Sequence, residues 1–384
     1  MQNFIFQNPV KILFGKNQIA SIAAEIPVNA RVLMIYGGGS IQQNGVYKQV
    51  KQALAKHIVF EFRGIEPNPC LETLIEAIDL VRTERIDFLL AVGGGSVLDG
   101  TKFIAAASSF EGDPWDILAK QAPILHALPL GAVMTLPATG SEMNAFFVVT
   151  KAATQEKLVG FSPSVYPQFS VLDPTTTFSL PPWQISNGIV DAFTHTIEQY
   201  LTYPVNAPLQ DRMAEAILKT LIEEGPKTLK NSTDYDARAN VMWCATMALN
   251  GLIGVGVPQD WSTHEIGHEL TALYGLAHAQ SLAVILPSMM QFKRAAKREK
   301  LLQYAERIWN ITDGNENQRI DTAIVNTKSF FESVGVSTCL ANYRLHSEQI
   351  SEICQHMKNR GSVALGEYSN IGLEDVEKVL TLSL

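Results

Sequence analysis

Five residues that could bind a metal ion occur in two tight groups. Asp191 and His195 lie four positions apart, and His264, His268 and His278 follow within one fifteen-residue stretch. A carboxylate and an imidazole at this spacing project from the same face of a helix. Oxygen and nitrogen donors without a thiolate suit a catalytic divalent iron or zinc ion. The sequence therefore predicts a metal held by two helices.

The second group also contains the motif of a different class of enzyme. The segment His264-Glu265-x-x-His268 matches the zinc peptidase motif, in which two histidines bind zinc and the glutamate activates water. A metzincin would continue with glycine and a third histidine, but the chain has Thr271 and Tyr274 there. The peptidase interpretation also gives no role to Asp191 or His195. We keep it as an alternative.

Length and composition indicate a soluble globular enzyme. A chain of 384 residues corresponds to about two domains. Its content of 46% hydrophobic and 18% charged residues is typical of a folded protein. The net charge of −8 argues against nucleic acid as the main partner, because binding to phosphates needs a basic face.

The cysteines and the chain start favour a cytoplasmic protein. The four cysteines are far apart and form no C-x-x-C pair, so we expect reduced thiols: Cys70, Cys244, Cys339 and Cys354. The first residues lack the pattern of an export signal, and no long apolar stretch predicts a membrane span. The charged run Lys293–Lys300 is expected to form the solvated outer face of a helix.

The first half of the chain has the pattern of an α/β fold. Arg31–Tyr36 and Phe88–Val92 are apolar runs of the kind found in strands buried on both faces of a parallel sheet. Each is followed by Gly-Gly-Gly-Ser and then by helical periodicity. Cys70–Arg82 predicts a helix, and Gly131–Leu136 and Phe169–Leu172 predict further strands. We therefore expect a doubly wound, dinucleotide-binding domain, with a parallel sheet and helices on both faces.

The pattern changes near residue 180. The prolines of Pro181-Pro182 disfavour a continuous helix through them. Helical spacing then dominates, in Ile185–Leu201, Leu209–Glu224, Arg238–Leu252 and Lys300–Trp309. The sequence predicts an α/β domain over residues 1–180 and an all-helical metal and substrate domain over residues 181–384.

The glycine-rich segments are candidates for phosphate binding. Gly93–Ser96 joins a strand to a helix, where main-chain N–H groups and the helix dipole favour an anion. The segment matches neither G-x-G-x-x-G nor a P-loop. A tight turn with Ser96 and Asp99 as a capping box is the alternative. Two such segments in one sheet favour a nucleotide.

The first glycine segment indicates which dinucleotide is bound. An acidic residue there would bind the ribose 2′-hydroxyl and repel a 2′-phosphate. The segment has none, and it consists of Gly37, Gly38, Gly39 and Ser40. The sequence therefore favours NADP(H) over NAD(H). A third polar stretch, Thr135–Glu142, follows another expected strand and would end at the same edge of the sheet.

Taken together, these motifs resemble the iron-containing (group III) alcohol dehydrogenases, within them the bacterial NADPH-dependent aldehyde reductases related to butanol dehydrogenases. The resemblance spans almost the whole chain. The segments that carry it are Gly93-Gly94-Gly95-Ser96-x-x-Asp99-x-x-Lys102, Thr139-Gly140-Ser141-Glu142, Asp191-Ala192-Phe193-Thr194-His195 and His264-x3-His268-x9-His278. The chain departs from the family at the missing acid of the first loop. It also has Thr135-Leu136-Pro137-Ala138-Thr139 where the family has Thr-Thr-Ala-Gly-Thr.

The resemblance implies a role for each group of residues. It implies four metal ligands, Asp191, His195, His264 and His278, and leaves His268 as a catalytic neighbour of the substrate. Gly94, Gly95 and Ser96 would bind the diphosphate, and Gly37 to Ser40 the 2′-phosphate side. The rest of the cofactor would contact Thr135, Thr139 and Lys157, with Asp99 either a contact or a helix cap.

We therefore expect an oxidoreductase that transfers a hydride between NADP(H) and an alcohol/aldehyde pair, acting on short to medium aldehydes with Fe²⁺ or Zn²⁺. We expect a proton to reach the substrate oxygen through His268 or through the cofactor ribose hydroxyl, and a pocket lined by Phe146, Phe147, Trp261 and Leu276. A homodimer is implied by the resemblance. The alternatives are the zinc peptidase and a lyase similar to dehydroquinate synthase on a related fold.

Overall fold

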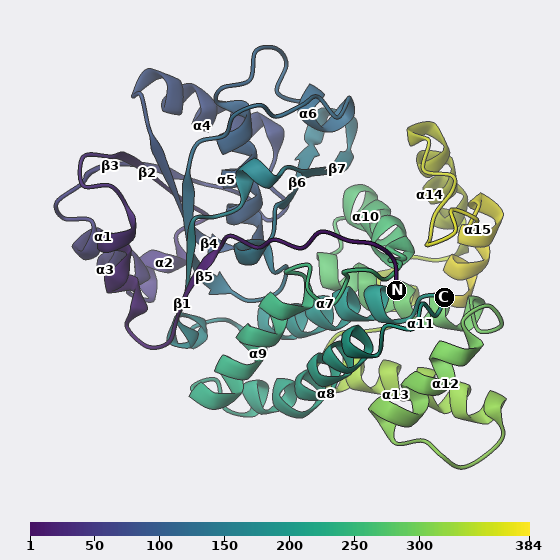
Figure 1. Cartoon of the computed structure of the whole chain (residues 1–384). Coiled ribbons are helices and arrows are strands. Elements are labelled where there is room, and N and C mark those ends of the chain that lie inside the picture. Colours follow the sequence, from purple (N-terminus) through teal and green to yellow (C-terminus); the bar gives the residue numbers. More distant parts are fainter. The chain divides into compact units, whose positions relative to one another are not determined.

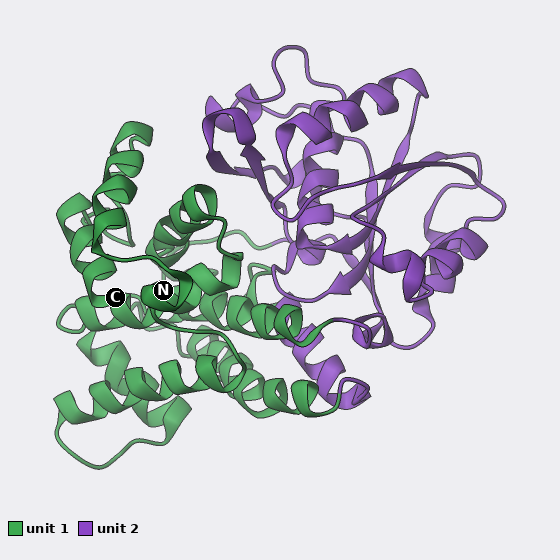
Figure 2. Ribbon diagram, turned by 180° about the vertical axis from the view of Figure 1, so that it is seen from behind, with its two compact units in different colours: residues 1–6, 181–231, 247–384 green, residues 7–180, 232–246 purple.

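A computed structural model describes all 384 residues of the chain, which fold into two compact units. The chain passes from one unit to the other between Leu180 and Pro181. For the fifteen residues 232–246 it returns to the unit that contains residues 7–180, and it then completes the other unit. Figure 2 shows the two units, which comprise residues 7–180 with 232–246, and residues 1–6 with 181–231 and 247–384.

The unit formed mainly by residues 7–180 is built on a six-stranded parallel sheet. The strand order is β1-β8-β5-β4-β2-β3. Successive side chains of a strand point to opposite faces: Leu33 and Ile35 join one hydrophobic cluster, and Val32 and Met34 join another. The strands are β1 (Lys11–Phe14), β2 (Arg31–Tyr36), β3 (Ile58–Arg63), β4 (Phe88–Gly94), β5 (Leu130–Leu136) and β8 (Phe169–Leu172).

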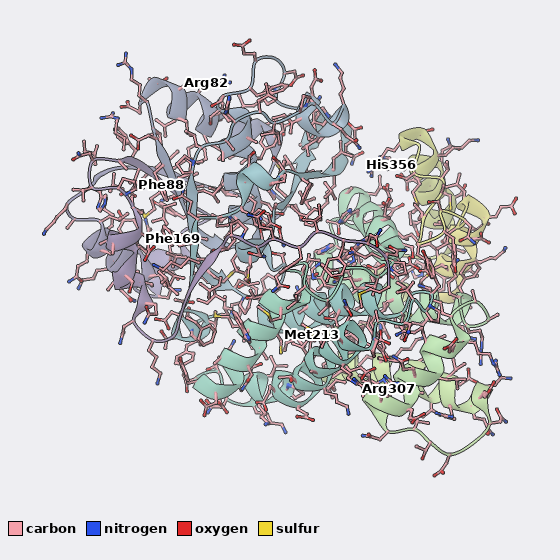
Figure 3. All side chains as sticks on the ribbon, in the orientation of Figure 1. Arg82, Phe88, Phe169, Met213, Arg307 and His356 are labelled. Carbon is pink, nitrogen blue, oxygen red and sulfur yellow. The ribbon has the colours of Figure 1, made fainter.

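Helices cover both faces of this sheet (Figure 1). The helices α4 (Leu71–Thr83) and α5 (Gly95–Ala107) pack on one face, and α1 (Ile22–Glu25) and α3 (Val46–Ala53) pack on the other. Within the sheet the rings of Phe88 and Phe169 stack with centroids 6.2 Å apart (Figure 3). The expected doubly wound α/β fold is confirmed.

Shorter elements complete this unit, and the sequence analysis did not identify them. The strands β6 (Phe146–Lys151) and β7 (Glu156–Phe161) form an antiparallel hairpin. Short helices connect the main elements: α2 (Ser40–Gln43), α6 (Asp116–Ala119), η1 (Gln18–Ser21), η2 (Ser141–Met143), η3 (Ala152–Thr154), η4 (Pro163–Val165) and η5 (Pro174–Thr177).

The other unit is helical, as expected, and none of its helices is long and apolar enough to cross a bilayer. In its interior α7 packs against α8 and α11, and α11 packs against α10 (Figure 1). The helices are α7 (Pro182–Tyr200), α8 (Pro208–Lys230), α10 (Ser262–Tyr274), α11 (His278–Phe292), α12 (Arg298–Trp309), α13 (Glu316–Ser333), α14 (Ser347–Arg360), α15 (Leu373–Leu382) and the short η6 (Leu340–Tyr343).

Helix α9 (Tyr235–Ala248) differs from its expected position in two ways. It ends four residues before Leu252, because the Asn250 side chain accepts a hydrogen bond from the Leu252 N–H and Gly251 has a φ of +91°. Most of the helix also belongs to the sheet-containing unit, where Thr246 donates a hydrogen bond to the buried Glu142 carboxylate.

The charged run Lys293–Lys300 does not form a solvated helix face, so that prediction is wrong. Residues 293–297 form a turn, and α12 begins at Arg298. The Lys297 side chain is buried and forms ion pairs with Asp260 and Glu367. Lys300 is also buried and pairs with Asp211 at 2.7 Å. Buried carboxylates on other segments, which a local charge pattern does not reveal, hold both lysines inside.

We expect Gly95→Ala to destabilise the sheet-containing unit. A Cβ at Gly95 would lie 2.6 Å from both Cγ2 and Oγ1 of Thr139. Overpacking of this kind costs about 1–3 kcal/mol. Gly38→Ala is the matched control, because a Cβ there meets nothing within 4 Å. Urea unfolding should show a lower midpoint for Gly95→Ala alone, and equal midpoints for the two variants would contradict the prediction.

Candidate functional site

Two candidate metal ligands project from one face of α7. Asp191 and His195 are 3% and 4% exposed, respectively, in a helix that is buried from Ile189 to Tyr200. Pro182 suits the first turn, where a missing N–H costs nothing. Asp191 Oδ1 lies 3.6 Å from His195 Nε2. The i, i+4 spacing therefore brings the two donors together as expected.

The other two candidate ligands come from a tight helical pair. His264 lies in the first turn of α10, and His278 is the first residue of α11. Gly275 ends α10 with a φ of +70°, which suits glycine, and the chain reverses there. His264 Nε2 and His278 Nε2 lie 3.9 Å and 3.6 Å from Asp191 Oδ1.

These four donors fit a divalent metal ion. One ligand atom from each of Asp191, His195, His264 and His278 lies within 4.8 Å of all the others. Donors about 2.0–2.2 Å from a zinc or iron centre are spaced at a few ångströms from one another. Burial lowers the pKa of His195 to about 4, so its imidazole is neutral near neutral pH, as a metal ligand must be.

The arrangement does not support the peptidase interpretation. His268 does not belong to the group of four donors, although its ring lies 5.4 Å from the ring of His278. Glu265, which would activate water in a peptidase, is exposed. The donors that converge with His264 come instead from Asp191 and His195 on α7.

The sequence analysis missed Glu198, a third polar residue on the same face of α7. It is 3% exposed, and its carboxylate contacts His264 Nδ1. Glu198 lies seven residues after Asp191 and three after His195, so the helical repeat that linked the first two could also have found it.

Trp261 precedes α10 in a left-handed conformation, with a φ of 41° that is uncommon for a bulky residue. Its ring centroid lies 5.3 Å from that of His264 and 6.2 Å from that of His195. The indole N–H donates to the Gln259 side chain at 2.9 Å. An aromatic wall therefore stands beside the candidate metal centre.

Two of the four residues expected to line a pocket are core residues instead. Phe147 is fully buried and packs against Phe103 with ring centroids 6.1 Å apart. Leu276 is buried in the hydrophobic cluster around α10, α11 and α14. Phe146 is 43% exposed on the β6–β7 hairpin, and the Trp261 ring lies beside His264 in the helical unit.

The glycine segments lie at neighbouring strand ends in the sheet-containing unit. Strands β2 and β4 are adjacent, with Tyr36 opposite Val92. The strand order reverses between them, which is the usual ligand position in a doubly wound sheet. Gly37–Ser40 follows β2, and Gly38 and Ser40 are exposed. In the second segment β4 continues to Gly94 and α5 starts at Gly95, so strand meets helix without a loop.

The other candidate cofactor residues gather around the start of α5. Gly95 lies under Thr139, which follows β5, and Thr135 is a buried residue of β5 itself. Asn68 joins two of the remaining candidates: its N–H donates to Ser96 Oγ at 3.2 Å, and its side chain accepts from Lys157 Nζ at 3.0 Å. The sequence analysis missed Asn68, although its place between two prolines and its φ of 58° mark an unusual turn.

Asp99 does not cap α5, so the capping-box alternative is wrong. The residue at the N-cap is Gly94, and no side chain caps the helix. The Asp99 carboxylate instead accepts hydrogen bonds from Ser141 Oγ at 2.7 Å and the Val148 N–H at 3.0 Å. It therefore ties α5 to the segment after β5.

The fully buried Lys102 completes this network. Its ammonium group donates to Ser141 Oγ, Asn144 Oδ1 and the Phe146 carbonyl at 2.8, 3.1 and 2.8 Å. The Asn144 amide in turn donates to the Thr139 carbonyl. Lys102 thus helps to hold Thr139 in place from inside the protein.

Comparison with known proteins identifies the family. The model described as "Iron-containing alcohol dehydrogenase" matches residues 9–174, and the model "Fe-containing alcohol dehydrogenase family, C-terminal" matches residues 185–384. The chain belongs to the iron-containing alcohol dehydrogenase family. It is therefore an oxidoreductase, and neither the peptidase nor the lyase alternative is supported.

Individual members of the family are similar over their whole length. The chain is 56% identical over 377 residues to the NADPH-dependent aldehyde reductase YqhD of Escherichia coli. The aligned region covers 97% of each protein. It is 39% identical over 389 residues to the probable NADH-dependent butanol dehydrogenase 1 of Bacillus subtilis, covering 100% of both.

Solved structures agree with this assignment. The crystal structure of Escherichia coli YqhD superposes with a TM-score of 0.99 at 54% identity, covering 100% of this chain and 99% of that one. The NADH-dependent butanol dehydrogenase A of Thermotoga maritima superposes with a TM-score of 0.96 at 36% identity, with coverage of 100% and 99%. The fold and family predicted from the sequence are confirmed.

The buried Lys102 predicts a pH dependence of stability. Burial lowers its pKa from 10.5 to about 8, while Asp99 and Glu142 act in the opposite direction. Between pH 8 and 10.5, Lys102 is therefore more protonated in the unfolded chain than in the folded protein. Its contribution to the free energy of unfolding consequently rises with pH in this window. We expect the free energy of unfolding of the wild type to increase relative to Lys102→Met across this window in urea titrations. A constant difference would contradict the lowered pKa.

Proposed function

We propose that this protein is an NADP(H)-dependent aldehyde reductase that acts on short to medium aldehydes at a divalent iron or zinc centre. The observation that carries the proposal is the convergence of three imidazoles on the Asp191 carboxylate, in a member of the iron-containing alcohol dehydrogenase family. The 56% identity to an NADPH-dependent aldehyde reductase supports the direction of the reaction.

The four proposed ligands are Asp191, His195, His264 and His278. A divalent ion there would supply Lewis acidity to a substrate oxygen. Since three of the donors are neutral when they bind metal, Asp191 is the one donor that carries negative charge. The Trp261 ring beside His195 and His264 gives an apolar, aromatic side to this centre, which suits an aldehyde with an aliphatic or aromatic substituent.

We propose that His268 relays a proton to the substrate oxygen. It lies one turn after His264 on α10, is partly exposed, and stands with its ring 6.3 Å from that of His264. An imidazole in this position can exchange protons near neutral pH.

The proposed cofactor contacts lie at the switch point of the sheet. Gly94, Gly95 and Ser96 would present main-chain N–H groups to a diphosphate. Gly37, Gly38, Gly39 and Ser40 would receive the 2′-phosphate, because no carboxylate of this segment repels it. Around them, Thr135, Thr139, Asp99 and Lys157 would hold the rest of the cofactor, with Asp99 acting through Ser141.

The assembly and location are also proposals. We propose a homodimer, as the family resemblance implies, and a location in the cytoplasm, which the four separated cysteines favour. Light scattering tests the homodimer, because a dimer has twice the 42.2 kDa mass of the chain. A monomeric mass would overturn the proposed dimer.

The metal centre is tested by three variants assayed for metal content and for NADPH oxidation with butyraldehyde. Asp191→Ala should lose the metal and lower kcat/KM by more than about a hundredfold, because even loss of a supporting contact costs about 10–100-fold. His268→Ala should keep the metal while kcat falls by about a hundredfold or more, as loss of a proton relay would.

The control is Glu265→Ala, at the exposed glutamate of the peptidase-like motif. It should keep both metal and reductase activity, whereas a peptidase would need that carboxylate. Unchanged metal content in Asp191→Ala would overturn the ligand assignment. Full kcat in His268→Ala would overturn the relay alone.

The choice of cofactor is tested at Ser40. Ser40→Asp places a carboxylate where we propose the 2′-phosphate binds, and about 1.4 kcal/mol of repulsion lowers kcat/KM for NADPH about tenfold. The neutral variant Ser40→Asn, of similar size, should lose much less. The wild type should prefer NADPH to NADH, and equal kcat/KM values for the two would contradict the proposal.

A further inference from the structure

The buried Glu198 joins α7 to the segment that carries His264. Its Oε2 contacts His264 Nδ1, and its Oε1 accepts a hydrogen bond from the Thr263 N–H at 2.6 Å. Its main-chain carbonyl also accepts from the Asp260 N–H at 2.9 Å. Through these three contacts Glu198 holds the start of α10, which carries His264, against α7.

The contact with Nδ1 determines which nitrogen of His264 can bind a metal. In its ionised form the Glu198 carboxylate only accepts hydrogen bonds, and the proton of the neutral His264 ring then lies on Nδ1. The lone pair is then on Nε2, the atom that lies 3.9 Å from Asp191 Oδ1. The opposite tautomer would place a proton where the metal is proposed to bind.

The Thr263 N–H strengthens this orientation. It belongs to the first turn of α10, where main-chain N–H groups and the helix dipole favour a negative charge. With one oxygen held by Thr263, the other is directed at the ring of His264. By contrast, His195 Nδ1 is buried and has no hydrogen-bond partner, so no carboxylate fixes the tautomer of that ring.

On the basis of the proposed function, we propose that Glu198 is a positioning residue for the metal centre: it orients His264, selects its Nδ1–H tautomer and thereby sets the affinity for the metal. Glu198 itself does not touch the metal. Carboxylates that accept from metal-binding histidines typically contribute about 10–100-fold to metal affinity.

The chain contains a matched control for this contact. Glu269, on the same helix as His264, is 1% exposed and its carboxylate contacts Nδ1 of His356 on α14, with Arg360 as a second partner. Neither partner is among the four proposed ligands. Glu269→Gln therefore disturbs a similarly buried carboxylate that is paired with a histidine, without involving His264.

The test measures the zinc Kd of metal-free protein by competition with a chromogenic chelator. We expect Glu198→Gln to weaken zinc binding about 10–100-fold, while Glu269→Gln stays close to wild type. A glutamine can accept from one N–H, but its NH₂ group then faces the other donor. An unchanged Kd in Glu198→Gln, or an equal loss in Glu269→Gln, overturns the proposal.

Two further measurements distinguish a failure of this proposal from a failure of the proposed metal ligands. His264→Ala should lose zinc binding, and if it does not, the ligand assignment fails whatever the result at Glu198. The ¹⁵N-histidine NMR spectrum of zinc-loaded wild type tests the tautomer without any variant that must fold. It should show His264 with a proton on Nδ1 and zinc on Nε2; zinc on Nδ1 overturns the role of Glu198.

Discussion

The helical unit depends on the burial of two carboxylates on one face of one helix. Asp191 and Glu198 are both 3% exposed. A carboxylate removed from water costs several kcal/mol unless a counter-charge or hydrogen bonds replace the lost hydration. The Glu198 carboxylate is met by the Thr263 N–H and by the His264 ring. Neutral imidazoles near Asp191 supply no positive charge. A divalent cation would balance the negative charge of Asp191, and its ligands would then join α7, α10 and α11.

The sheet-containing unit depends on a different constraint, the close approach of the Thr139 side chain to the Gly95 main chain. Gly95 lies under Thr139 with no space for a methyl group, and Lys102 and Asp99 hold the segment after β5 from beneath. Asn68 ties the start of α5 to Lys157. Since these contacts are made by the protein alone, the N–H groups at the strand ends are ordered before any ligand binds. Such preorganisation lowers the cost of binding a phosphate.

The sequence predicts those features that depend on local spacing. The strands β2, β4, β5 and β8 follow from apolar runs, and the pairing of Asp191 with His195 follows from the helical repeat. Spacing alone does not distinguish His264 from His268, because both lie on α10 and either could face a metal; the family resemblance made that distinction. The misplaced features depend on distant partners: Lys297 is buried by Asp260 and Glu367, and Phe147 by Phe103. The capping alternative for Asp99 fails because its partners, Ser141 and Val148, come from another part of the chain.

Family membership and fold do not by themselves decide the dinucleotide. The relatives that superpose with TM-scores of 0.99 and 0.96 are Escherichia coli YqhD, which is described as NADPH-dependent, and a butanol dehydrogenase described as NADH-dependent. A parallel sheet with a diphosphate at its switch point serves both cofactors, since they share the diphosphate. The 2′-phosphate is the only chemical difference, and it carries negative charge. With the cofactor contacts proposed above, discrimination would come from the charge at the end of β2, where Gly38 and Ser40 are exposed and their segment contains no carboxylate.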